Sequence, residues 1–284
     1  KPAWLGNRTI CLVDGSEVVY GGPAKIQSML HYCVDAFTLA MQALQLTERG
    51  GGEKLSRFEQ FGPHAVVVAD RVYGTLPGME HLRERGSGFV LRLRAKAFKV
   101  YNRAGQEIEL LKGFKGLQAG ENGSVAVYYR TPEGDMPVRI CALRKDQKSE
   151  QAGLERLKKI NQHKRHGRPI SALQRAYNKY LLVATSLDET ISAKQVLETY
   201  RIRWQIELVF KRLKSLFHYN EAPVKLEQSA RAWFYGKLLL AALCEVLVNR
   251  GRFSPGRARA DRDGTAESVE GTENYSDVGD PSHT

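Results

Sequence analysis

The sequence predicts an α/β fold in which an antiparallel, β-rich segment interrupts a sheet core. Residues 9–14 end in an aspartate and residues 65–69 are followed by one, and both apolar runs have the composition of strands that are covered on both faces. Residues 95–145 alternate short apolar segments with Gly, Asn and Pro turns, which is typical of antiparallel strands. Helical spacing of apolar residues then dominates as far as residue 249. A chain of 284 residues is long enough for a sizeable core and about two domains.

The first third of the chain predicts the sheet core. Gly15 and Ser16 follow the first apolar run as a turn, the glycines at 50–52 break the chain again, and Gly86 ends a helical pattern. In chain order, we expect strands at residues 9–14, 29–35 and 38–47, a helix at 53–61, a strand at 65–69, a helix at 76–85 and a strand at 89–93.

The remaining chain predicts the interrupting segment and a helical end. We expect short strands at 100–101, 108–111, 125–129, 138–143 and 181–184, a basic helical stretch at 149–180, and helices at 193–217 and 228–249. Four parts follow from this order: residues 1–94 and 185–250 as the two halves of the core, 95–184 as the β-rich insertion with its basic helix, and 251–284 as a polar, disordered tail.

The charge is unevenly distributed. The net charge is +12, although residues 251–284 hold four arginines and seven acidic residues, so the excess of base lies in the first 250 residues. Such a body suits a polyanionic partner, either nucleic acid or an anionic membrane surface. A surplus of surface lysine is the alternative interpretation of charge alone.

Several classes of protein and site are excluded or disfavoured. Cys11, Cys33, Cys141 and Cys244 are far apart without a CxxC pair, so we expect free thiols and no zinc site. The longest apolar run, residues 238–248, contains Glu245 and is too short to span a membrane. The chain begins Lys-Pro-Ala-Trp, without Met or a signal segment, so we expect a fragment.

Two aspartates occupy matching places in the predicted sheet. Asp14 and Asp70 each follow an apolar run, and neighbouring strands would bring the two carboxylates to one sheet edge, where open α/β sheets bind ligands. An aspartate after a strand is also a routine turn former, which is the alternative for either residue alone.

The predicted helix at 193–217 carries a third acid. At 100° per residue, one narrow polar stripe lies along the border of the apolar face. It consists of Tyr200, Arg203, Glu207, Lys211 and Lys214. We expect the apolar face to pack on the sheet and Glu207 to point along its rim. The alternative is a solvated helix stabilised by the i,i+4 pairs of Glu207 with Arg203 and Lys211.

These residues resemble a known family. Tyr200, Arg203, Glu207 and Lys214 match the Y-(2)-R-(3)-E-(6)-K signature of the DDE transposases of bacterial insertion sequences. Val13-Asp14-Gly15-Ser16 is similar to the first-Asp motif of that family, in which Thr is more usual than Ser. Residues 69–73, Ala-Asp-Arg-Val-Tyr, are similar to its second-Asp motif. The resemblance covers residues 4–250.

The resemblance implies an RNase H-like core with a mixed sheet and a β insertion between the second Asp and the Glu. It implies that Asp14, Asp70 and Glu207 are catalytic and hold two Mg²⁺ ions, for which Mn²⁺ can substitute, because carboxylate oxygens suit these hard cations. The implied reaction is cleavage at transposon ends, followed by attack of the freed 3′-OH on target DNA. No protein nucleophile takes part.

The resemblance also implies contacts to DNA. Tyr200, Arg203 and Lys214 are expected at the transposon end, with Lys211 as a further phosphate contact. Trp204 either stacks on a base or packs against the insertion. The basic stretch either follows the DNA backbone or is a solvated face. Its basic residues are Arg156, Lys158, Lys159, Lys164, Arg165 and Arg168.

The implied partners are transposon-end and target DNA and a second copy of the chain in a synaptic complex, in the bacterial cytoplasm at the nucleoid and without a membrane. Family members carry an N-terminal region that recognises the inverted repeat, which we expect this chain to lack, and the tail after residue 250 does not resemble a family C-terminus. Two alternatives therefore stay open: an RNase H-like nuclease without strand transfer, and a catalytically silent DNA-binding remnant.

Overall fold

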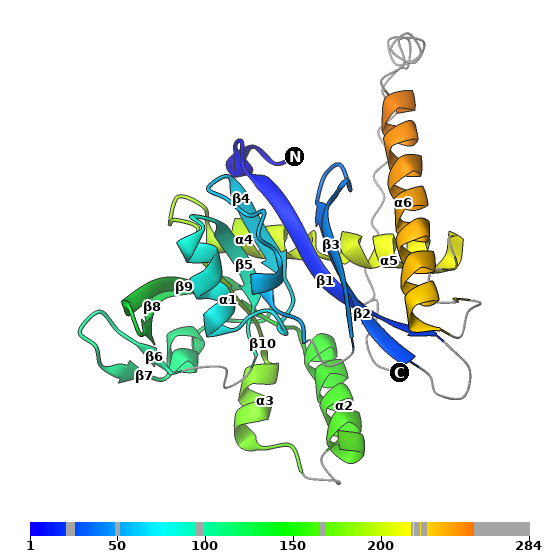
Figure 1. The fold of residues 1–284 in the computed structure, drawn as a ribbon. Coiled ribbons are helices and arrows are strands. Elements are labelled where there is room, and N and C mark those ends of the chain that lie inside the picture. Colours follow the sequence, from blue (N-terminus) through cyan, green and yellow to red (C-terminus); the bar gives the residue numbers. More distant parts are fainter. Residues whose placement is uncertain are drawn as a thin grey trace, which may run out of the picture. The chain divides into compact units, whose positions relative to one another are not determined.

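The fold is built on one mixed sheet of ten strands, in the order β3-β2-β1-β4-β5-β10-β9-β8-β6-β7 (Figure 1). The computed structural model describes residues 1–20, 26–48, 52–94, 99–164, 169–216 and 226–252, together with His218 and Ala222. Residues Lys1–Ala241 form one compact unit, which contains all ten strands, and Ala242–Thr284 form a second. The tail predicted at 251–284 lies almost entirely outside the described residues.

The first five strands form the core of the sheet. β1 (Thr9–Tyr20), β2 (Ile26–Asp35) and β3 (Met41–Glu48) are antiparallel, whereas β4 (Ala65–Ala69) runs parallel to β1, and β5 (Gly88–Arg92) runs parallel to β4. β4 is central because its Ala-Val-Val-Val-Ala sequence has no polar side chain to solvate. Helix α1 (Leu76–Glu84) connects β4 to β5 and is capped by Thr75, whose hydroxyl accepts from the Gly78 N–H. This order confirms the α/β, RNase H-like core with a mixed sheet.

The second half of the sheet is antiparallel, as predicted for the insertion. It contains β6 (Val100–Tyr101), β7 (Glu107–Ile108), β8 (Asn122–Thr131), β9 (Gly134–Arg144) and β10 (Tyr180–Thr185). β10 pairs with both β5 and β9, so these strands continue the core sheet. The basic stretch forms α2 (Gln147–Lys164) and α3 (Ala172–Asn178). The boundaries 94/95 and 184/185 stay predictions.

Three predicted elements differ from the structure. β1 continues through the expected Gly15–Ser16 turn to Tyr20, because Ser16 and Val18 still face the interior and pair with β2. The helix expected at 53–61 is only a 3-10 turn, η3 (Leu55–Arg57), since i, i+3 spacing of three apolar residues fits a 3-10 turn as well as an α-helix.

The third difference is a break in the helix expected at 193–217. The chain forms α4 (Ala193–Arg201) and α5 (Trp204–Leu216), separated by Ile202 and Arg203. Across the break, the N–H groups of Ile202, Arg203, Gln205 and Ile206 all bond three residues back, which tightens the turn. The helix expected at 228–249 is present as α6 (Glu227–Arg252).

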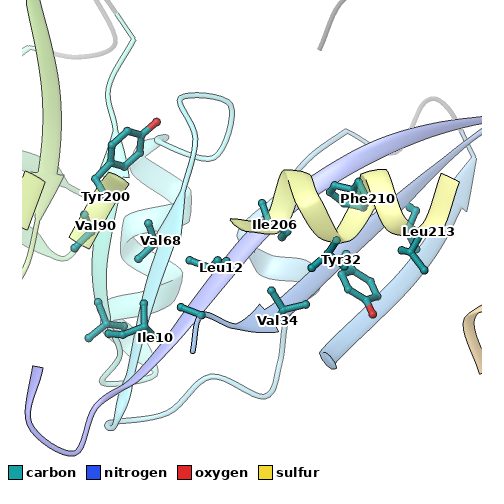
Figure 2. Close-up of a cluster of buried hydrophobic side chains, with 14 of the residues drawn as sticks. Ile10, Leu12, Tyr32, Val34, Val68, Val90, Tyr200, Ile206, Phe210 and Leu213 are labelled. Atoms are coloured by element: carbon teal, nitrogen blue, oxygen red, sulfur yellow. The ribbon is translucent and has the colours of Figure 1, made fainter. Parts of the chain in front are cut away.

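The sheet is covered on both faces. On one face, α4 and α5 pack on the strands, and Figure 2 shows Ile206, Phe210 and Leu213 of α5 among side chains of β1 and β2. The Phe210 and Tyr32 rings lie 6.0 Å apart between centroids. On the other face, η3 and α1 supply Leu55, Phe58, Met79 and Leu82. Because both faces of the sheet are covered, the acids that follow the paired parts of β1 and β4 lie at an edge of the sheet.

The prediction of free thiols is confirmed. All four cysteines are free, and Cys11, Cys33 and Cys141 are buried. Among the described residues, none of the helices has the length and apolar character needed to cross a membrane.

A buried histidine makes stability depend on pH. His31 of β2 is fully buried, with its Nε2 2.9 Å from the Thr47 hydroxyl. Burial, helped by the charge of Arg57, lowers the pKa of His31 from 6.5 to about 4. The neutral form is therefore favoured in the folded state, so its contribution is complete above pH 6.5 and is lost as the pH falls towards 4.

We expect the unfolding free energy to fall by about 2 kcal/mol more in the wild type than in His31→Gln between pH 7 and pH 5. Urea denaturation at the two pH values measures this. Parallel losses in the two proteins would contradict the prediction.

Candidate active site

The two aspartates lie side by side at one edge of the sheet. β1 and β4 are parallel, and the last pair in their register is Val13 with Ala69. Asp14 and Asp70 are the next residues on the two chains. The sequence predicted that Asp14 ends its strand, whereas β1 continues beyond it. Asp14 directly follows the part of β1 that pairs with β4. Asp70 is held in the turn after β4, where one carboxylate oxygen accepts from the Val72 N–H at 2.5 Å.

Glu207 is placed near this edge of the sheet by helix α5. It lies in the first turn of α5, whose apolar face is anchored on β1 and β2. Its side chain is one-third exposed, which agrees with the predicted position at the border of the buried face.

Arg203 joins the strand acid to the helix acid. Its Nη1 lies 3.1 Å from Oδ2 of Asp14, and its Nη2 lies 2.5 Å from Oε1 of Glu207. The side chains of Arg203 and Asp14 are only 14% and 19% exposed, so the ion pairs are poorly screened by solvent. Arg203 itself is one of the two residues between α4 and α5.

Burial dominates the electrostatics of the site. Burial raises the pKa of the Asp14 carboxyl to about 7; Arg203 and the Gly15 N–H act against this rise, and Asp70 and Glu53 add to it. Burial works against the charge of Arg203, but Tyr200 and the carboxylates outweigh it and raise the pKa of the guanidinium. An additional cation at this edge would stabilise the ionised carboxylates.

The donor chemistry fits a divalent metal ion. Asp14, Asp70 and Glu207 offer only carboxylate oxygens, which are the ligands that Mg²⁺ and Mn²⁺ prefer. In the part of the chain that the structure describes, no three His, Cys, Asp or Glu side chains are arranged to hold a metal ion. The Arg203 guanidinium, itself a cation, lies between Asp14 and Glu207 and shows that this position accepts positive charge.

The other residues of the predicted signature have different surroundings. Tyr200 of α4 is buried, and its hydroxyl has no hydrogen-bond partner among the described residues. Trp204, at the start of α5, is 53% exposed. Lys211 and Lys214 are exposed on the same helix. Because the helix breaks before Trp204, the continuous wheel does not apply to Tyr200.

The predicted basic face is only partly described. Arg156, Lys158 and Lys159 are exposed on α2. The side chain of Lys164, and Arg165 and Arg168 altogether, lie outside the described residues.

Sequence reasoning missed Glu53, and it gave no role of its own to Tyr73, the last residue of the second-Asp motif. Glu53 precedes η3, and its carboxylate lies against Gly15, next to Asp14. The Tyr73 hydroxyl donates to Oε1 of Glu53 at 3.5 Å. No motif marks Glu53. The signal that could have indicated a close neighbour was a glycine directly after an apolar strand run.

The bridge formed by Arg203 leads to a prediction on stability. We expect Arg203→Ala to lower the unfolding free energy by roughly 2 kcal/mol, because two partly buried carboxylates lose their shared cation. Mn²⁺ should then raise the melting temperature more in this variant than in the wild type. Calorimetry with and without Mn²⁺ tests both expectations.

Arg83→Ala is the matched control, since Arg83 forms a 3.3 Å pair with Glu133 in which both side chains are more exposed. Its cost should stay below about 1 kcal/mol. Equal costs for the two variants would show that the Arg203 bridge is not stabilising.

Sequence comparisons relate this chain to known proteins. The family described as "Transposase DDE domain" matches residues 6–243. The transposase of insertion sequence element IS421 from Escherichia coli is 30% identical over 256 residues, which cover 87% of this chain and 68% of that protein. The transposase of IS231F from Bacillus thuringiensis subsp. israelensis is 25% identical over 199 residues, covering 64% of this chain and 41% of the relative.

Proposed function

Because the chain belongs to the family of insertion-sequence DDE transposases, we propose that it cleaves transposon ends and joins the freed 3′-OH to target DNA with Asp14, Asp70 and Glu207 as its catalytic acids. The observation that carries the proposal is the bridge from Asp14 through Arg203 to Glu207. It brings together a strand acid and a helix acid that are far apart in the sequence, beside the second strand acid, Asp70.

The three acids would hold the divalent metal ions that this family generally uses. When bound, two such ions activate the attacking oxygen and stabilise the leaving oxygen of an in-line displacement. Asp14 and Asp70 are rigidly placed by the paired strands and by the Val72 N–H. Glu207 is carried by a helix packed on those strands, so substrate and acids meet on a fixed frame.

Exposed residues of α5 would contact the DNA. Lys211 and Lys214 are on the same helix as Glu207 and would neutralise phosphates near the acids. The exposed Trp204 ring is available to stack on a base. The burial of Tyr200 argues against its contact with a sugar or phosphate while α4 keeps this position. Arg203 keeps N–H donors beyond its contacts with Asp14 and Glu207, and one of these would contact a phosphate.

The acting form that we propose is a dimer of this chain on two transposon ends. The exposed basic residues of α2 would follow the backbone of the bound DNA. Salt dependence of DNA binding would report those contacts, because each neutralised phosphate releases counterions.

The test is a strand-transfer assay on the full chain. The protein is mixed with a labelled duplex that ends in a free 3′-OH, a supercoiled plasmid and Mg²⁺ or Mn²⁺, with a chelator in the control. We expect joined product only when the cation is present. Cation-dependent nicking without joining would instead identify a nuclease, and DNA binding without either product would identify a silent remnant.

A further inference from the structure

An arginine stands in the same row of the sheet as the two strand aspartates. β1, β4 and β5 are parallel neighbours, and their pairing runs in step as far as Ala69 of β4. The next residues on the three strands are Asp14, Asp70 and Arg92, which is the last residue of β5. The sheet edge that presents two acids therefore also presents a base on the neighbouring strand.

These three residues lie on the face of the sheet that α4 and α5 cover. Successive side chains of a strand alternate between the two faces. The side chains two positions earlier on the three strands belong to the apolar cluster under α4 and α5, and they are Leu12, Val68 and Val90 (Figure 2). On its other side, Arg92 pairs with Val183 of β10, which belongs to the same cluster. Arg92 is thus flanked by an acid on one strand and by an apolar residue on the other.

Arg92 has no acidic partner in the part of the chain that the structure describes. The carboxylate of Asp70, its neighbour in the row, accepts from the Val72 N–H, and none of the ion pairs among the described residues includes Arg92. The residue is half-buried. A guanidinium carries several N–H donors, and it is costly to hold one partly out of water without an anion. An anion that binds at this edge would compensate the charge.

The position of Arg92 suits a phosphate of DNA. Helix α5, with the exposed Lys211 and Lys214, packs on β1 and β2, which lie on one side of Asp70 in the sheet. Arg92 lies on the opposite side of Asp70, on β5. A DNA strand that crosses the acids would therefore meet cations on both sides. The planar fork of a guanidinium also matches two oxygens of one phosphate.

We propose that Arg92 binds a backbone phosphate of the DNA strand that lies across Asp14 and Asp70. The inference rests on the proposed function for the presence of DNA at these acids. It goes beyond that function because Arg92 belongs neither to the three acids nor to the signature on the helices. Transposon-end DNA and target DNA offer the same phosphodiester chemistry, and the test separates these two sources.

The test is DNA binding by the full chain at several salt concentrations, with a chelator present. The probes are a labelled duplex that ends in a free 3′-OH and a closed circular plasmid. We expect Arg92→Gln to weaken binding by about tenfold and to lower the slope of log affinity against log salt by about one. A loss confined to the duplex would assign the phosphate to the transposon end, and a loss confined to the plasmid would assign it to the target.

The salt slope separates a phosphate contact from a structural role, because only the loss of a phosphate contact changes the number of counterions released. Arg92→Lys keeps the charge, so it should keep the slope while losing part of the affinity. The matched control is Arg103→Gln, which makes the same change at an exposed residue in the turn between β6 and β7. Both its affinity and its slope should equal those of the wild type.

A second measurement on the wild type keeps the proposal testable if Arg92→Gln does not fold. Arginines are modified with 1,2-cyclohexanedione and identified by mass spectrometry. We expect the bound duplex or plasmid to protect Arg92 and to leave Arg103 reactive. An unchanged slope for both probes in a folded Arg92→Gln protein, or equal modification of Arg92 with and without DNA, would overturn the inference.

The proposed function fails separately. If the wild type neither cleaves nor joins DNA while Arg92→Gln still lowers the salt slope, the phosphate site stands and the transposase activity does not. If the wild type joins DNA and the slope is unchanged in Arg92→Gln, only the role of Arg92 is wrong.

Discussion

Asp14→Asn will lower the rate of strand joining by about a thousandfold or more, and Glu207→Gln will do the same. Each substitution replaces a carboxylate by a neutral amide of nearly equal shape, so the packing around the sheet edge is kept. What is lost is the negative charge that would hold the metal ions, and their contribution to the transition state amounts to several kcal/mol. The measurement is the single-turnover rate of joining a pre-cut duplex to a plasmid, with Mg²⁺ and with Mn²⁺.

Asp135→Asn is the control for this loss, because it makes the same chemical change at an exposed position of β9, in the hairpin that β9 forms with β8. Its joining rate should equal that of the wild type. Substantial joining by a folded Asp14→Asn protein would remove Asp14 from the reaction, and the assignment of this sheet edge as the active site would fail with it.

Phe210→Ala will cost about 3–5 kcal/mol of unfolding free energy and will also reduce strand joining. Phe210 is 9% exposed and packs on Tyr32 of β2, so truncation leaves a cavity between α5 and the sheet. It lies three residues from Glu207, on the helix that carries this acid to the sheet edge. Loss of the contact loosens the helix and therefore the geometry of the three acids.

Urea denaturation and the joining assay measure the two effects, with Leu216→Ala as control. Leu216 is the last residue of the same helix and is 70% exposed, so its removal should cost less than about 0.5 kcal/mol. A stable Phe210→Ala protein with normal joining would show that α5 does not depend on this contact for its position.

The sequence was informative where burial and periodicity act locally. The all-apolar strand at 65–69 needs cover on both faces, and this alone places it at the sheet centre with Asp70 at its end. The apolar face of residues 204–216 likewise predicts which side of α5 packs on the sheet. The prediction that Asp14 and Asp70 lie close together depended on two such strands being neighbours in the sheet.

What the sequence did not predict depends on contacts between distant residues. Apolar spacing continues across Ile202 and Arg203, so a helical wheel does not reveal that the turn tightens there. It also does not reveal that the Arg203 guanidinium contacts Asp14. Gly15 resembled a turn residue because a strand glycine and a turn glycine look alike in one sequence. In the structure, the side chain of Glu53, 38 positions away, occupies the space that a side chain at Gly15 would need. No local pattern in the sequence connects these two residues.

The contact of Arg203 with Asp14 joins parts of the chain that are synthesised at different times, and the proposed catalytic acids are likewise made in sequence. Asp14 and Arg203 are 189 residues apart, and Asp70 also lies far before Glu207 in the sequence, so a growing polypeptide carries both strand aspartates long before the helix acid exists. At ordinary rates of protein synthesis, that interval lasts on the order of ten seconds or more. A chain interrupted anywhere before α5 would display the two aspartates without Glu207, so the proposed role of Glu207 predicts that a premature stop yields a protein that does not cut DNA.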